Sequence, residues 1–355
     1  MLSPLDKEVL RSWSRHAVAP RLARVMGRPG TRRGARDDGP RIAVVGNCQS
    51  YGVAYGMKLL EPLATVDRFT MIGHSYVTLR ALARTLATYD HVFVHEFLPG
   101  HLRNGGDSQD LVGLLPKTRL FGPVCFAAFH PDLVFIHDPT RLHGYVTGPL
   151  GPYQSALCLF AYLKGLSLDM ANALFNENVF EAVGYLDMWG EASRELVETA
   201  RDKFGLDLSA ELMSWSRRGV FMYSSVHPMG FVMCDVARKL LESAGLSPRA
   251  INSHYYDIDE LARSDIFPVY PPIAKHYGVQ GSYLFKCENH HISQGVGDFL
   301  TLPQFLARCY EAFAGHDRAE LANPRVEGWL ADEASSRILI KLARENLAAG
   351  LTPAL

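Results

Sequence analysis

The segment Gly46-Asn47-Cys48-Gln49-Ser50 places a nucleophilic thiol between side-chain amides, where a short apolar run gives way to helical spacing. A cysteine in the first turn of a helix lies among unpaired backbone N–H groups, which lower the pKa of the thiol. Gly46 allows a sharp turn, and the amides of Asn47 and Gln49 could join those N–H groups around a developing oxyanion. The pattern predicts a nucleophilic-cysteine site; the alternative is a buried cysteine packed under a helix cap.

Two histidines share one local pattern, in which an apolar segment ends in His-Pro. They occur in Phe129-His130-Pro131-Asp132 and in Val226-His227-Pro228. Proline favours an extended conformation for the preceding residue, and residues two apart in an extended segment point to the same side. We therefore expect Asp132 to approach the side chain of His130. Each histidine alone is more often structural than catalytic, but two of them together with Cys48 favour a shared site.

Other candidate motifs carry less information. His95-Glu96 lacks the second histidine of a zinc-protease motif, and the adjacent pair in Glu288-Asn289-His290-His291 is more typical of a polar loop than of metal ligands. The six cysteines form no C-x-x-C pair, which argues against zinc and against a disulfide framework. The sequence GVGDF at 295–299 has no strand-helix-strand context, and no P-loop motif occurs, which removes NAD(P) and P-loop nucleotide chemistry from the leading options. No metal is expected.

The elements around these residues predict an α/β fold. The runs RIAVVG (41–46), VDRFTMIG, HVFVHEF and RLFGPVCFAAF, which begins at Arg119, read as buried strands, and helical spacing separates the first three. This alternation is typical of a small parallel sheet with right-handed crossovers. After Pro152 the pattern becomes helical. We expect a helix-rich α/β protein with a small, mainly parallel sheet in the N-terminal half, wrapped by a larger helical C-terminal half.

Residues 1–40 differ in composition from the rest and read as an N-terminal basic helix and linker. The remainder, 41–355, is predicted to be a single catalytic domain with a sheet-containing part (41–150) and a mainly helical part (151–355). Apolar residues in the N-terminal segment recur at near-helical spacing among arginines. A helix docked on the main domain is favoured; an interfacial helix that holds the enzyme near a membrane is the alternative.

The composition narrows the classes of partner and compartment. A net charge of -1 and a pI near 6.9 make nucleic acid a poor partner, so an anionic ligand must be met by a few local cations. No secretory signal and no run of about 18 apolar residues is visible, so we expect a cytoplasmic protein, at the inner face of the membrane if the interfacial helix exists.

The combination of segments resembles the WcbI family of capsular-polysaccharide biosynthesis proteins. The resemblance spans roughly residues 41–315 and rests on the order of the segments GNCQ, HPD, NENVFEAVGYLDMWGEASRELVE, SWSRRGVFMYSSVHP, GSYLFK and LTLPQFLARCYEAF. It implies a coenzyme A-binding O-acetyltransferase in which Cys48 and His130 are site residues and His227 lies near the same pocket. Acetyl-CoA would be the acyl donor and a hydroxyl of a polysaccharide-precursor sugar the acceptor.

Two routes of transfer fit that chemistry. Cys48 could carry the acetyl group as a thioester, with a histidine deprotonating the sugar hydroxyl, or His130 could activate the hydroxyl for direct attack while Cys48 lines the pocket. Arg217, Arg218 and Lys286 lie close to the motif segments and are candidates to bind the phosphates of coenzyme A. A carbohydrate or lipid esterase with the same Cys/His site, and a non-catalytic glycan- or nucleotide-binding protein, are the competing classes. The sequence does not indicate the oligomeric state.

Overall fold

The computed structural model describes residues 2–18, 39–136, 144–256, 259–288 and 297–353. The chain forms two compact units that alternate along the sequence. The first unit comprises Met1–Val124, Val197–Glu211 and Met229–Leu261, and the second comprises Cys125–Leu196, Leu212–Pro228 and Ala262–Leu355. Among the described residues no helix is both long and apolar enough to cross a bilayer.

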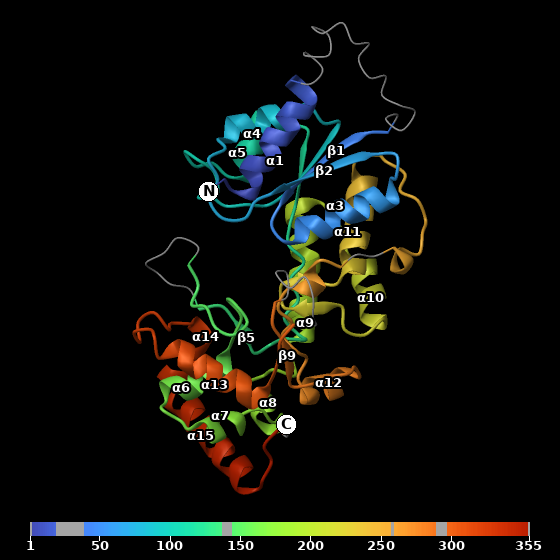
Figure 1. Ribbon diagram of the computed structural model, residues 1–355. Helices are drawn as coiled ribbons and strands as arrows, with labels where there is room; N and C mark the ends of the chain where they lie inside the picture. Colours follow the sequence, from blue (N-terminus) through green and yellow to red (C-terminus); the bar gives the residue numbers. More distant parts are fainter. Residues whose placement is uncertain (1, 19–38, 137–143, 257–258, 289–296, 354–355) are drawn as a thin grey trace, which may run out of the picture. The chain divides into compact units, whose positions relative to one another are not determined.

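The first unit is built on a four-stranded parallel sheet of order β2-β1-β3-β4 (Figure 1). Its strands are β1 (Arg41–Gly46), β2 (Thr65–Thr70), β3 (His91–His95) and β4 (Thr118–Phe121). Strand β1 is buried on both faces, which explains why it reads as a continuous apolar run. The helices of this unit are α1 (Pro4–Trp13), η1 (Ser14–Val18), α3 (Gln49–Leu60), α4 (Leu79–Leu86), α5 (Ser108–Leu114), η2 (Thr199–Lys203), α11 (Gly230–Ser243) and η3 (Ser253–Tyr255).

Helices α1, α4 and α5 cover one face of the sheet, on the same side in Figure 1. Side chains that alternate along β1 and β3 meet the apolar faces of these helices. The core they form includes Ala43, Val45, Val92, Val94, Leu5, Leu82, Leu86 and Leu111. Polar contacts also hold α1 in place, because the carboxylate of Asp6 accepts hydrogen bonds from Ser75 and from the backbone of Tyr76. Helix α1 is therefore part of the first unit.

The opposite face of the sheet is covered by α3, which packs closely on α11. A Cβ atom added at Gly52 would lie 2.7 Å from Cβ of Met233, and one added at Gly56 would lie 2.9 Å from Cβ of Ala237. The two glycines thus let the helices approach more closely than side chains would allow.

The fourth strand is shorter than the run that begins at Arg119 predicts. Strand β4 ends at Phe121, because Pro123 has no N–H group to donate to a neighbouring strand. At Gly122 the ring of Phe204 occupies the space of a side chain, with Cε2 2.3 Å from the position of an added Cβ. The rest of the apolar run continues into the second unit, which begins at Cys125.

The second unit is mainly helical, and its described residues form three small antiparallel strand pairs. Its helices are α6 (Ala156–Leu163), α7 (Leu168–Asn172), α8 (Glu177–Ala182), α12 (Pro271–Tyr277), α13 (Leu302–Phe313), α14 (Pro324–Ala331) and α15 (Glu333–Ala348). The strand pairs are β5 (Leu133–Val134) with β6 (Gln154–Ser155), β7 (Met222–Ser224) with β8 (His227–Pro228), and β9 (Leu284–Lys286) with β10 (Phe299–Thr301).

Three further helices lie near the points where the chain passes between units: α9 (Trp189–Glu198), α10 (Ser209–Arg217) and η4 (Leu261–Arg263). Between α8 and α9 the chain turns at Gly184, which adopts a positive φ of 75°. The predicted fold class, a helix-rich α/β protein with a small parallel sheet in the N-terminal half, is confirmed.

Candidate active site

The sheet of the first unit has a topological switch point between β1 and β3. These strands are neighbours, yet α3 follows β1 onto one face of the sheet and α5 follows β3 onto the other. Connections that diverge in this way open a crevice at the carboxyl ends of the two strands, where ligands bind in open α/β sheets. Strand β1 ends at Gly46, next to Cys48, and β3 ends at His95.

Position 46 has no room for a side chain larger than that of glycine. A Cβ atom there would lie 2.5 Å from Cβ of His95 and 3.1 Å from Cβ of Ser50, in the first turn of α3. The φ angle of Gly46 is not in the left-handed region, so the close approach of His95 and Ser50, and not a left-handed backbone, is what requires glycine at this position. The side chain of His95 therefore lies on the α3 face of the sheet, beneath the beginning of that helix.

Cys48 is the N-cap residue of α3 and is partly exposed. Asn47 forms the turn that precedes it: its side-chain oxygen accepts a hydrogen bond from the backbone N–H of Gln49 at 3.1 Å. The carbonyl of Asn47 accepts from the hydroxyl of Ser50 at 2.6 Å. The predicted placement of Cys48 at the strand-to-helix junction is confirmed.

The protonation of Cys48 differs from the prediction. Burial of the thiol raises its pKa above the ordinary value, and this outweighs the hydrogen bond with the backbone of Gln49, which lowers it. The expected low pKa is wrong because the effect of the helix terminus is smaller than the loss of solvation. Cys48 is a neutral thiol at pH 7, so a reaction at its sulfur requires a proton acceptor.

The side-chain amide of Gln49 bonds the backbone of Val124. The amide donates to the carbonyl oxygen of Val124 and accepts from the backbone N–H of the same residue, both at 3.0 Å. Gln49 is 2% exposed. The amide fixes the segment that follows β4, and the predicted role of Gln49 in transition-state binding stays a prediction. The side chain of Asn47 accepts through its oxygen, and the predicted role of its amide nitrogen as an oxyanion donor stays a prediction.

His95 carries a basic nitrogen into this region. Its Nδ1 lies 2.9 Å from the carbonyl oxygen of Glu96, which can only accept, so Nδ1 holds the proton and Nε2 presents a lone pair. Nε2 is buried and has no hydrogen-bond partner among the described residues. Burial lowers the pKa of His95, so the imidazole is neutral at pH 7. The ring stands perpendicular to that of Phe121, with centroids 5.2 Å apart.

From the sequence, His95 is a weaker candidate than His130 and His227, because His95-Glu96 lacks the second histidine of a zinc-protease motif. A signal was nevertheless present, since His95 lies near the end of the third predicted strand, HVFVHEF, and it is the last residue of β3 in the structure. Residues at that position meet the end of the first strand if the two strands are neighbours.

The predicted site residues His130 and His227 belong to the second unit, where both contact the β7–β8 pair. Nε2 of His130 lies 3.4 Å from the carbonyl oxygen of Met222, and its Nδ1 has no partner in the described part of the chain. Burial lowers the pKa of His130 to about 4. The imidazole of His227, within β8, lies 3.1 Å from the hydroxyl of Tyr153.

Asp132 does not pair with His130. Its carboxylate accepts from the backbone N–H of Leu157 and from the hydroxyls of Tyr185 and Tyr270, each at 2.9 Å. The expected contact assumed an extended segment, but the backbone N–H of Leu133 donates to the carbonyl of His130, which closes a turn. Asp132 is fully buried, and loss of solvation raises its pKa. It anchors the interior of the second unit.

The candidate cations also lie in the second unit. The ammonium of Lys286, on β9, donates to the carbonyl oxygen of Ser264 at 3.0 Å, and burial lowers its pKa. Arg217 ends α10, and Arg218 follows it. Their predicted role in phosphate binding stays a prediction. The segment 289–296, which includes His290, His291 and the start of GVGDF, is outside the described residues. Within the described ranges no group of three or more His, Cys, Asp or Glu side chains is placed to hold a metal ion.

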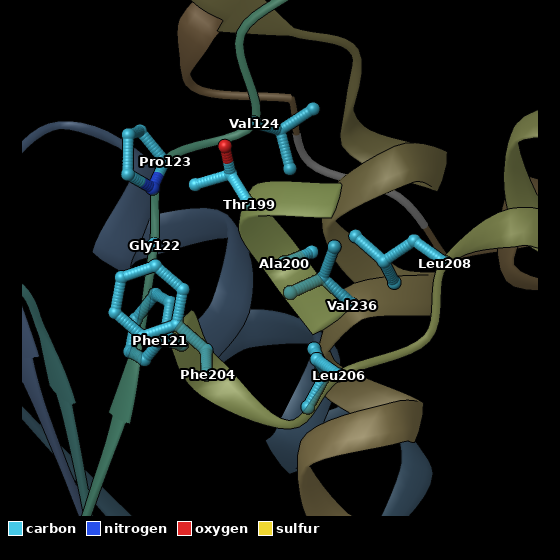
Figure 2. Close-up of a pocket in the computed structure, with 10 residues that line it drawn as sticks. All are labelled: Phe121, Gly122, Pro123, Val124, Thr199, Ala200, Phe204, Leu206, Leu208 and Val236. Atoms are coloured by element: carbon cyan, nitrogen blue, oxygen red, sulfur yellow. The ribbon is translucent and has the colours of Figure 1, made fainter. Parts of the chain in front are cut away.

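A small apolar cavity lies beyond β4 in the first unit (Figure 2). It is lined by Phe121, Gly122, Pro123, Val124, Thr199, Ala200, Phe204, Leu206, Leu208 and Val236. Its volume is about 20 Å³, which is enough for about one water molecule. This cavity is a packing defect too small for a substrate.

Comparisons with known proteins agree with the resemblance found in the sequence. A family model described as polysaccharide biosynthesis enzyme WcbI matches residues 41–249, which is more than half of the chain and includes Cys48, His95, His130 and His227. A search of curated proteins gave no match. One similar solved structure is described as that of WcbI, a novel polysaccharide biosynthesis enzyme, as the native protein without a disulfide bond between coenzyme A and one of its cysteines. It has 14% sequence identity and a TM-score of 0.56, covers 86% of this chain and 99% of its own, and shows a shared fold. The match over residues 41–249 establishes that this chain belongs to the WcbI family of polysaccharide biosynthesis enzymes.

Proposed function

We propose that the chain is a coenzyme A-dependent O-acyltransferase that moves an acetyl group from acetyl-CoA to a hydroxyl of a polysaccharide-precursor sugar. The observation that carries the proposal is the placement of Cys48 just after β1 and of His95 at the end of the adjacent strand β3, with Nε2 of His95 buried and without a hydrogen-bond partner among the described residues. The similar solved structure supports it, because its description pairs coenzyme A with a cysteine of that protein. A thiol site that admits the sulfur of coenzyme A also admits the thioester formed on that sulfur.

In the first step the sulfur of Cys48 attacks the carbonyl carbon of the acetyl thioester. The thiol proton passes to Nε2 of His95, the new sulfur–carbon bond forms, and the bond to the sulfur of coenzyme A breaks. The leaving sulfur takes the proton from Nε2, so His95 returns to its neutral form. Because one thioester replaces another, the step is nearly thermoneutral.

His95 suits this step because both partners begin uncharged. Burial raises the pKa of Cys48 and lowers that of His95, so a stable ion pair is disfavoured and the proton moves only as the sulfur attacks. Nδ1 stays fixed by its hydrogen bond to the carbonyl of Glu96, which holds the ring in one orientation.

In the second step the sugar hydroxyl attacks the acetyl carbon on Cys48, its proton passes to an imidazole, and the sulfur of Cys48 leaves and is reprotonated. His95 can accept that proton, and His130 remains a second proposed acceptor. Backbone N–H groups at the start of α3 and the amide nitrogen of Asn47 would stabilise the oxyanion of both steps.

The test is acetyl transfer from acetyl-CoA to a panel of sugar acceptors, measured by release of coenzyme A and by acetylation of the sugar. We expect Cys48→Ala to abolish transfer and Cys125→Ala, which changes another partly exposed cysteine, to leave it intact. Release of coenzyme A at the same rate without any acceptor would identify a hydrolase instead. Binding of coenzyme A with no turnover on any acceptor would favour a binding protein.

A further inference from the structure

Helix α1 presents an apolar, basic face to solvent. Its other side is tied to the first unit: Leu5 is 1% exposed, and the carboxylate of Glu8 accepts from the hydroxyl of Thr70 at 2.8 Å. The hydroxyl of Ser12 bonds that of Tyr89 at 3.0 Å. On the outer side Leu10 is 53% and Trp13 58% exposed. An exposed tryptophan and leucine on a helix that is otherwise firmly docked are costly to leave in water.

These two side chains line a groove between α1 and α4. The groove has a volume of about 450 Å³ and is lined by Val9, Leu10, Ser12 and Trp13 from α1 and by Ala81, Arg84, Thr85 and Thr88 from α4. It lies within the first unit, away from the carboxyl ends of β1 and β3.

The charge around the groove is positive. Arg84 lines the groove and is exposed, and Arg11 is exposed on the same helix as Trp13; neither forms an ion pair among the described residues. The carboxylates of α1 accept hydrogen bonds from within the first unit: Asp6 accepts from Ser75, and Glu8 accepts from Thr70. Between Glu8 and Asp37 the sequence holds eight arginines and no acidic residue, in a chain whose net charge is -1. Trp13 therefore belongs to a stretch of sequence that is basic throughout.

We propose that this face of α1 and α4 docks on an anionic phospholipid bilayer. Tryptophan and leucine enter the boundary between headgroups and acyl chains, and arginines bind lipid phosphates. A second copy of the chain fits less well, because a symmetric contact would bring the arginines of both copies together. The proposal does not rest on the acyltransferase function.

The experiment is sedimentation of the full chain with vesicles of phosphatidylcholine, with and without phosphatidylglycerol. We expect the wild type to sediment only with the anionic vesicles, and binding to weaken as ionic strength rises. The double variant Leu10→Ser/Trp13→Ser and the double variant Arg11→Gln/Arg84→Gln should each lower the partition coefficient about tenfold or more. Met213→Ser changes a side chain that is 59% exposed on α10 and serves as the matched control.

Deletion of the helix is not a suitable test, since Leu5 and Asp6 belong to the folded unit. The substituted side chains are exposed, and melting curves of the variants should match that of the wild type. Failure of the wild type to sediment with anionic vesicles, or equal sedimentation of the Leu10→Ser/Trp13→Ser variant, would overturn the proposal. A wild-type dimer that this variant converts to a monomer, without vesicle binding, would assign the face to self-association instead.

Discussion

Substitution of Gly46 by alanine tests the geometry of the site through stability. The added Cβ would lie 2.5 Å from Cβ of His95, where an ordinary contact is at 3.4–4 Å. Neither atom is the free end of a flexible chain, because both are attached directly to backbone that neighbouring strands hold by hydrogen bonds. Relief therefore requires a shift of strand or helix, and overpacking of this kind costs about 1–3 kcal/mol. We expect Gly46→Ala to lower the free energy of unfolding by about 2 kcal/mol.

The matched control is Gly113→Ala in α5. No heavy atom lies within 4 Å of the Cβ position there, and the backbone is helical. Alanine should raise the free energy of unfolding at this position by about 0.5–1 kcal/mol, because it restricts the unfolded chain. Urea denaturation of the two variants and the wild type gives both values. If Gly46→Ala were within about 0.5 kcal/mol of the wild type, the close approach of β1 to His95 would be refuted.

Two further perturbations probe the neighbouring contacts and the second unit. Gln49→Leu should lower the free energy of unfolding by about 2 kcal/mol or more, because it leaves the N–H and C=O of Val124 unpaired. The same change at the exposed Gln109 should be nearly neutral, and urea denaturation measures both. His130 titrates at about 4 when folded and near 6.5 when unfolded, so between these pH values the unfolded chain binds more protons and stability falls as the pH falls. The free energy of unfolding should fall by about 3 kcal/mol across that window. His130→Phe should flatten this part of the curve of unfolding free energy against pH. An unchanged slope would contradict the burial of a neutral imidazole.

The sequence predicts best the strand that is buried on both faces of the sheet. Strand β1 has the continuous apolar sequence of a buried parallel strand, and its junction with α3 follows from the end of that run. The end of β4 could not be predicted in the same way. Apolar residues continue past Phe121, and the strand ends there because of a proline and of the ring of Phe204, which comes from a distant part of the chain.

The position of the candidate site could be predicted from the sequence, but the protonation of Cys48 and the side chains around it could not. The place of Cys48 follows from local sequence, but its raised pKa follows from burial that only tertiary packing produces. The role proposed for His95 depends on β3 lying next to β1, which the order of strands in the sequence does not specify. Asp132 was assigned to His130 by the alternation of an extended segment, and a turn places its carboxylate among tyrosine hydroxyls instead.

The central claim is that Cys48 carries the acyl group and that His95 accepts its proton. The most direct measurement is the rate at which acetyl-CoA alone acetylates Cys48, followed by mass spectrometry of the intact protein and of its peptides as a function of pH. We expect one acetyl group on Cys48 in the wild type, none in Cys48→Ala, and a rate about 10²–10⁴-fold lower in His95→Gln near pH 7. The defect of His95→Gln should shrink as the pH rises toward the pKa of the thiol, because the thiolate then forms without a base. Acetyl transfer to sugar that persists in Cys48→Ala, with no adduct on the wild type, would contradict the account and favour direct attack by the sugar hydroxyl on bound acetyl-CoA.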